Sequence, residues 1–256
     1  MTFPIRVSVE RAITPAVDHP ALQRAPIREA IVDVRVEATS NDETVERYVQ
    51  HLGGEFQPAE PRDECELTWD TKNGTASSRV KQRGWLARSF DGTRVVQART
   101  DRLTFSRLPP YQSWAATRAL AEHAWDRYRQ ATKPQRIHRL ALRYINRIDL
   151  PAPVGDFDDY FRTFPRIGEG IQQSLAGFFM RIVVPHKGVH VAITQTIDSS
   201  TASEAITPVI LDIEAFEVCD LDALTGEFWH RFEHLRVVKN DIFFGSLTKQ
   251  AWGLFT

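Results

Sequence analysis

The chain has 256 residues, of which 42% are hydrophobic and 25% charged, and its formal net charge is −1. This composition is typical of a globular protein with a large core, in one or two domains. No apolar run approaches the roughly 20 residues that span a bilayer, and the first residues lack a signal-peptide core. We therefore expect a cytoplasmic protein without membrane contact. Cys65 and Cys219 lie far apart and are expected to be ordinary reduced thiols.

The charge is unevenly distributed along the chain. Sixteen basic and four acidic residues lie between positions 79 and 147, whereas the segments before and after carry net charges of −6 and −7. A basic segment of this kind is typical of an anion-binding face, but acidic flanks can also neutralise it internally. We favour internal neutralisation, because much of the basic charge alternates along predicted strands that must have neighbours.

The first half begins with a proline-containing segment, residues 1–25, that predicts an extended arm. An alternating strand is expected at 27–37, followed by a helix that Asn41 or Asp42 caps and Gly53-Gly54 ends. Residues 55–78 are acidic and rich in turn residues, including Asn73-Gly74, and predict a long loop with at most a short strand at 67–69. The remaining elements expected in this half are strands at 78–90, 94–100 and 102–108 and a helix at 112–130.

The second half begins with the clearest element of the chain, a strand over residues 136–151. One parity carries apolar residues with a single polar member, Asn146, and the other carries mostly charged residues, so one face is expected to be buried. The apolar members are Leu140, Leu142, Tyr144, Ile148 and Leu150. The later elements expected are a short helix at 156–164, strands at 178–184, 189–197 and 209–218, a helix at 221–238 and a closing apolar segment.

Residues 26–135 and 136–256 therefore share one predicted order: strand, helix, three strands, long helix. The Trp125–Tyr128 segment of the first long helix also resembles the Trp229–Phe232 segment of the second. We predict an α+β fold in which two pseudo-repeated halves form one compact, saddle-like unit, with a curved antiparallel sheet and the helices on one face.

Signatures of catalysis are missing from the sequence. There is no Gly-x-Ser-x-Gly elbow and no glycine-rich phosphate loop. His230 and His234 lie one helical turn apart, but Arg231 stands where a zinc-protease helix needs glutamate, and no third ligand is evident. The sequence therefore predicts no catalytic residue, no metal and no cofactor.

Two rows of cations are the strongest candidates for a binding surface. Arg79, Lys81, Arg83 and Trp85 occupy alternate positions, and a regular strand would point all four the same way. Such a row is typical of a surface for single-stranded nucleic acid or another polyanion. The second row consists of Arg139, Arg143 and Arg147. Against this interpretation, Asp212 and Glu214 alternate on a later strand and are candidates to pair with one of the rows.

Beyond these patterns, the chain resembles an uncharacterised, sporadically distributed prokaryotic family of similar length. The residues that carry the resemblance are Pro26-Ile27, Glu29-Ala30, Arg143-Tyr144-x-Asn146-x-Ile148-x-Leu150-Pro151, Leu211-Asp212, Ala215-Phe216, Leu235, Lys239-Asn240, Phe243 and Leu247-Thr248. The family has no assigned activity, and its patchy distribution implies accessory genes of mobile conflict or defence loci. Asn146 and Asn240 are the polar positions to inspect first.

Three functional hypotheses follow. The first is a non-catalytic binding or accessory module that forms a homodimer or a complex with another protein. The second is a nucleic-acid-binding protein that uses the basic strand face. The third is a small-ligand or enzyme site between sheet and helices, because a buried Asn146 must be hydrogen-bonded or costs about 1–3 kcal/mol.

Overall fold

The computed structural model describes residues 19, 22–70, 75–168, 170 and 175–255, with side chains described outside positions 63–83. Its centre is a single antiparallel sheet, curved and open, with strand order β2-β3-β4-β5-β1-β6-β9-β8-β7. The strands are β1 (Ile27–Val36), β2 (Glu60–Asp70), β3 (Thr75–Arg88), β4 (Arg94–Arg99), β5 (Arg102–Arg107), β6 (Arg136–Pro151), β7 (Phe179–His186), β8 (Val189–Ile197) and β9 (Ile206–Asp222).

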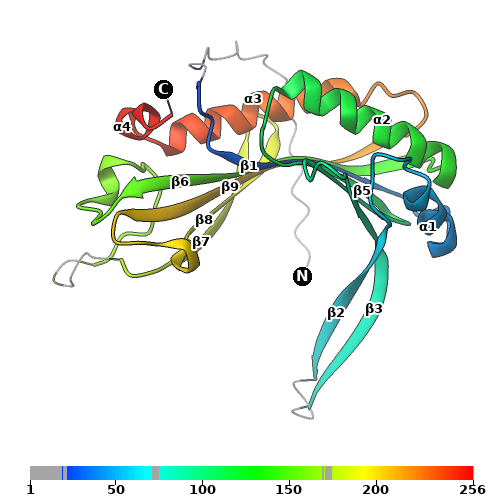
Figure 1. The fold of residues 1–256 in the computed structure, drawn as a ribbon, viewed down its shortest axis with the longest axis horizontal. Coiled ribbons are helices and arrows are strands. Elements are labelled where there is room, and N and C mark those ends of the chain that lie inside the picture. Colours follow the sequence, from blue (N-terminus) through cyan, green and yellow to red (C-terminus); the bar gives the residue numbers. More distant parts are fainter. Residues whose placement is uncertain (1–18, 20–21, 71–74, 169, 171–174, 256) are drawn as a thin grey trace, which may run out of the picture.

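The helices lie on one face of this sheet (Figure 1). They are α1 (Asp42–Gln50), α2 (Trp114–Thr132), α3 (Trp229–Ser246) and α4 (Lys249–Gly253), with short 3₁₀ turns η1 (Phe157–Asp159) and η2 (Ser199–Thr201). The predicted α+β class with a curved antiparallel sheet is confirmed. In the described part of the chain, no helix is long and apolar enough to cross a membrane.

Strand β6 joins the two halves of the sheet, because it pairs with β1 on one side and β9 on the other. Its predicted alternation is confirmed: Leu140, Leu142, Ile148 and Leu150 are fully buried beneath the helices, and Tyr144 nearly so. The opposite parity faces the side of the sheet that no described helix covers, here called the open face.

The same connection order follows β1 and β6. After the first strand of each half, the chain crosses to the outer edge of the sheet and returns inward strand by strand, so the last strand, β5 or β9, lies next to the first. The halves differ in detail, because β2 has no counterpart and η1 stands where the first half has α1. The pseudo-repeat itself stays a prediction.

The expected loop at 55–78 is wrong, because Glu60–Asp70 is a strand. Strand β2 pairs with β3 along its whole length, and the two form a ribbon that projects from the body (Figure 1). A ribbon that leaves the core buries neither face there, so its sequence lacks the apolar alternation that reveals a half-buried strand. The predicted turn Asn73-Gly74 lies outside the described residues, as does the predicted arm 1–25 apart from His19 and 22–25.

Two predicted helices also differ from the structure. The short helix at 156–164 is only the 3₁₀ turn η1, followed by Phe161, which is fully buried and forms a bridge with Leu247. The long helix at 221–238 begins eight residues later, because β9 continues pairing with β6 as far as Asp222. It also ends later, because Phe243 and Phe244 continue its buried side.

Gly84 lies where the ribbon leaves the sheet, since the β3–β4 pairing begins at Trp85. Its φ is +152°, and a Cβ built there would lie 2.4 Å from the carbonyl oxygen of Ala98. We expect Gly84→Ala to lower the free energy of unfolding by more than the about 1–3 kcal/mol of a strained backbone alone, measured by urea denaturation. Gly54→Ala is the matched control, because nothing lies within 4 Å of that position. Equal stability of the two variants would contradict this account.

Candidate functional site

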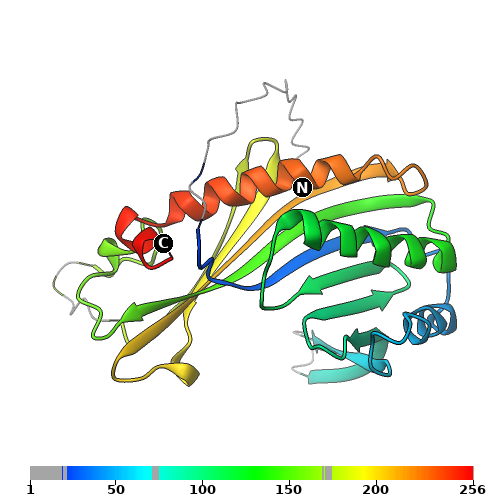
Figure 2. The same cartoon turned by 45° about the horizontal axis from the view of Figure 1, so that its top comes forward.

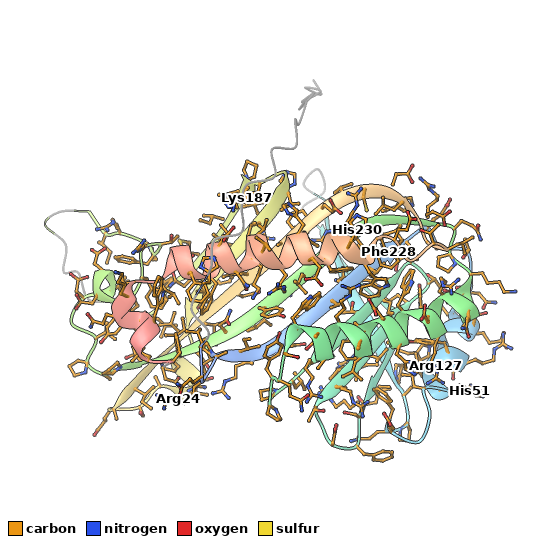
Figure 3. The ribbon with its side chains drawn as sticks, turned by 90° about the horizontal axis from the view of Figure 1, so that it is seen from above. Arg24, His51, Arg127, Lys187, Phe228 and His230 are labelled. Carbon is orange, nitrogen blue, oxygen red and sulfur yellow. The ribbon has the colours of Figure 1, made fainter. Side chains whose placement is uncertain are left out.

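A cavity of about 220 Å³ lies on the helix side of the sheet, where α3 passes over the beginning of β1 and the middle of β6. Figure 3 shows α3 lying across the strands in this region. Both polar positions that the resemblance singled out, Asn146 and Asn240, line it. The other lining residues are Leu22, Ala25, Pro26, Ile27, Tyr111, Trp114, Tyr144, Arg236, Lys239, Phe243 and Phe244. The walls are mostly apolar and aromatic, with a few polar groups, which is typical of a small-molecule site.

Lys239 is the unusual member of this set. The residue is only 7% exposed, and its Nζ lies 3.6 Å from the centroid of the Tyr144 ring. Within the described residues, the amine has no carboxylate partner. Burial, and then the nearby charge of Arg236, lower the pKa of Lys239 to about 7. A buried lysine is normally paired, so an unpaired one in a cavity is a candidate functional group.

Two tyrosines form the wall next to this amine. The hydroxyl groups of Tyr111 and Tyr144 lie 2.9 Å apart, and their rings meet edge to face. Burial raises the pKa of both hydroxyls. Both therefore stay protonated at neutral pH, and one of them has a proton to donate beyond the hydrogen bond that they share.

Asn146 behaves as its place on the buried parity of β6 predicts. It is 2% exposed, and its Nδ2 donates to the carbonyl oxygens of Leu211 at 3.0 Å and Tyr144 at 3.3 Å. The predicted hydrogen bonding of this buried amide is confirmed. Its Oδ1 accepts no hydrogen bond within the described part of the chain, so one acceptor remains for a ligand in the adjoining cavity.

The carboxylates near the cavity are already paired. Glu233 accepts hydrogen bonds from Trp114 at 2.7 Å, Arg118 at 2.9 Å and Arg236 at 3.3 Å. Burial raises the pKa of Glu233, but these three hydrogen bonds outweigh burial and the net pKa is lower than usual. None of the cavity's lining residues is acidic, whereas Arg236 and Lys239 are basic. The cavity therefore favours an anion.

On α3, Asp241 is likewise taken up by other groups. It pairs with His19 at 2.7 Å and with Lys187 at 2.5 Å, and His19 also stacks on Phe244. These contacts hold His19 and the β7–β8 turn against α3. Asp241 is therefore paired with His19 and Lys187 and not with Lys239.

The second cationic row lies together on the open face, where carboxylates pair with each member. Arg139 contacts Glu214 at 2.7 Å and Asp33 at 3.4 Å, and its guanidinium lies 4.3 Å from the centroid of the Phe216 ring. Arg143 binds Asp212 through two hydrogen bonds of 2.8 and 2.5 Å.

Arg147 completes the row and contacts Asp149 at 2.7 Å. The predicted pairing of Asp212 and Glu214 with this row is confirmed. The three arginines are therefore neutralised by carboxylates of their own sheet, which weakens the case for a polyanion surface here.

The first cationic row is not brought next to the second. The side chains of Arg79, Lys81 and Arg83 lie outside the described residues, but their backbone positions belong to the projecting ribbon. There the register places Arg79 opposite Glu66 and Lys81 opposite Glu64. Trp85, the row's aromatic member, is half-buried and packs against the core.

His230 and His234, the histidine pair on α3, are not joined by a third candidate ligand within the described part of the chain. His234 contacts the carbonyl oxygen of Lys187 through its Nε2 at 2.8 Å. Among the residues whose positions are described, no three His, Cys, Asp or Glu side chains converge in the way that a metal ion requires.

Sequence analysis missed Lys239 and Tyr111 as site residues. A signal for Lys239 was present, because Leu235, Lys239 and Phe243 follow one another at intervals of four. Residues at that spacing share one helix face, and an apolar face places the lysine inward. Tyr111 lies in the connection before α2, where no periodicity indicates a direction. No protein-family model matches the sequence, and no curated protein matches it.

Proposed function

We propose that the protein is a non-catalytic binding protein whose ligand is a small molecule with an anionic group next to an apolar part. The observation that carries this proposal is the buried amine of Lys239, which opens on a cavity and pairs with no carboxylate of the described residues. A bound carboxylate or phosphate would supply the missing counter-charge. The gain would be large, because an ion pair is much stronger away from bulk water.

The lining residues support this division of the ligand into two parts. Arg236 and Lys239 offer donors to an anion at one side, and the amide of Asn146 adds a polar contact. Aromatic residues, among them Trp114 and Phe243, offer an apolar wall at the other side. The volume of about 220 Å³ lies below the about 300–1,000 Å³ typical of drug-sized ligands, which favours a small metabolite.

The expected result of a binding test is that phenylacetate and phenyl phosphate stabilise the protein, whereas the uncharged 2-phenylethanol does not. A ligand at 100 times its dissociation constant adds about 2.7 kcal/mol to the free energy of unfolding. For a chain of this length, that gain raises the melting temperature by about 5–10 °C. Differential scanning fluorimetry over a range of ligand concentrations measures this shift.

Variants identify the site. Lys239→Met and Arg236→Gln are expected to remove most of the shift, each compared with its own ligand-free melting temperature. Lys249→Met is the matched control, because Lys249 is exposed on α4, away from the cavity. Equal stabilisation by 2-phenylethanol, or a full shift in Lys239→Met, would contradict the proposal.

The other hypotheses stay predictions. The structure of a single chain does not test whether the protein forms a homodimer or binds a protein partner. Nucleic-acid contact through the first row depends on side chains outside the described residues.

A further inference from the structure

We propose that Lys239 holds its ligand covalently and reversibly, as an imine formed with the carbonyl carbon of a small 2-oxo acid. This inference rests on the proposed function, because it assigns the cavity to the same ligand. It narrows the ligand class from any small anion to one with a ketone or aldehyde next to the carboxylate.

The surroundings of the amine carry the inference. Nζ lies against the face of Tyr144 and on the wall of the cavity, and no described residue accepts a hydrogen bond from it or pairs with it. A structural lysine of this fold behaves differently: Lys187, for example, binds Asp241 at 2.5 Å. No described acidic residue pairs with the amine of Lys239, so its lone pair is available for reaction when the amine is uncharged.

The charge around Lys239 favours that uncharged form. On α3, Arg236 lies beside it, Glu233 is paired with Arg118 and Arg236, and Asp241 is paired with His19 and Lys187. The groups that face it from β6 and the segment before α2 are the neutral hydroxyls of Tyr144 and Tyr111.

Burial of the amine, and then the charge of Arg236, lower the pKa of Lys239 to about 7, so about half of these amines are uncharged at pH 7. At the ordinary lysine pKa of 10.5, only about one amine in three thousand would be uncharged at pH 7.

Imine formation needs only the amine, the carbonyl compound and proton transfers. The Nζ lone pair forms a bond to the carbonyl carbon, and the carbonyl π electrons move to oxygen, which takes a proton. Nitrogen loses one proton to give the carbinolamine, whose hydroxyl group takes up a proton and leaves as water while the nitrogen lone pair forms the C=N bond. Nitrogen then loses its last proton to give the imine. One water molecule is released for each imine formed, with no oxidant or reductant.

The rest of the cavity fits a 2-oxo acid. Arg236 lines the cavity and binds Glu233 through its Nε at 3.3 Å, which leaves the other donors of its guanidinium for the carboxylate of the ligand. The hydroxyl pair of Tyr111 and Tyr144 offers a proton to the oxygen that becomes the carbinolamine hydroxyl. The apolar wall accepts the side chain of the acid.

The test uses the full chain, phenylpyruvate as the probe and sodium cyanoborohydride to reduce any imine to a stable secondary amine. Peptide mass spectrometry then locates the adduct. At pH 7 we expect labelling of Lys239 to exceed that of the exposed Lys133 and Lys249 by at least about tenfold, because of its larger uncharged fraction. Labelling should saturate with phenylpyruvate and decrease when phenylacetate competes.

Further readouts separate the two proposals. Lys239→Arg keeps the charge and should lose the adduct while retaining part of the thermal shift with phenylacetate. Stabilisation by phenylpyruvate without an adduct at Lys239 would overturn the imine and leave the proposed function standing. An adduct at Lys239 that neither saturates nor responds to phenylacetate would overturn both, because it would show a reactive amine without a ligand site.

Discussion

Lys239→Met is expected to stabilise the protein, and by more at pH 6 than at pH 9. The lysine charge is buried without a carboxylate partner among the described residues, which opposes folding wherever the amine is protonated. Methionine has a similar length and no charge, so it keeps the contact with Tyr144 and removes the cost of burying the ammonium group.

The pH dependence follows from the two pKa values. The unfolded chain holds this proton up to about pH 10.5, whereas the folded chain releases it near pH 7. Between these values the unfolded state binds more protons, so the stability of the unmodified protein rises with pH. Below pH 7 both states are protonated, and the full cost of the buried charge is present.

We therefore expect the stability advantage of Lys239→Met to decrease by about 2–3 kcal/mol from pH 6 to pH 9. Urea denaturation at several pH values measures it, and groups common to both proteins cancel in the difference. Lys249→Met, which removes an exposed charge, should show a nearly constant difference over the same range. A constant difference for Lys239→Met as well would mean that the amine has an ordinary pKa in the folded protein.

Elements that bury one face could be predicted from the sequence, and those that bury none could not. Strand β6 was predicted within its observed bounds, because its apolar parity lies under the helices and its charged parity on the open face. Of the two residues predicted to cap α1, Asn41 is the one that forms the side-chain hydrogen bond, whereas the cap of α2, Ser113, was not predicted. Strand β2 was missed because a projecting ribbon needs no buried face.

The site was only half visible in the sequence. Asn146 stood out as the one polar residue on an apolar parity, and the structure places it beside the cavity. Lys239 was overlooked although it shares a helix face with Leu235 and Phe243, because charged residues are ordinarily expected on the exposed side of a helix. The cavity is lined by residues from β1, β6, α3 and the segment before α2. These segments are distant in the sequence, and local periodicity does not predict which distant segments lie together.

The two long helices are joined by aromatic side chains. Trp125 and Trp229 are both buried. The ring of Trp125 meets that of Phe228 in the other half edge to face, with centroids 5.3 Å apart, and the ring centroid of Trp229 lies 5.0 Å from that of Phe228. Phe228, labelled in Figure 3 next to the beginning of α3, therefore lies between the two tryptophans; Figure 2 shows α2 and α3 side by side.

We expect Trp125→Ala and Trp229→Ala each to lower the free energy of unfolding by about 3–5 kcal/mol. That loss is a large part of the about 5–15 kcal/mol typical of folded proteins. Because both indoles pack on Phe228, the double variant should deviate from additivity by about 0.5–3 kcal/mol. Lys81→Ala and Arg83→Ala are the controls and should change stability by less than about 0.5 kcal/mol.

Urea denaturation of the single variants and the double variant measures both effects. If the tryptophan variants were additive, each half would be stabilised by its own core, and Phe228 would not couple them. If the lysine and arginine variants were the destabilising ones, the first cationic row would be part of the fold's internal electrostatics. The expected pattern, large and coupled losses at the tryptophans alone, would show that one aromatic cluster connects α2 to α3 and so holds the helix layer above the cavity.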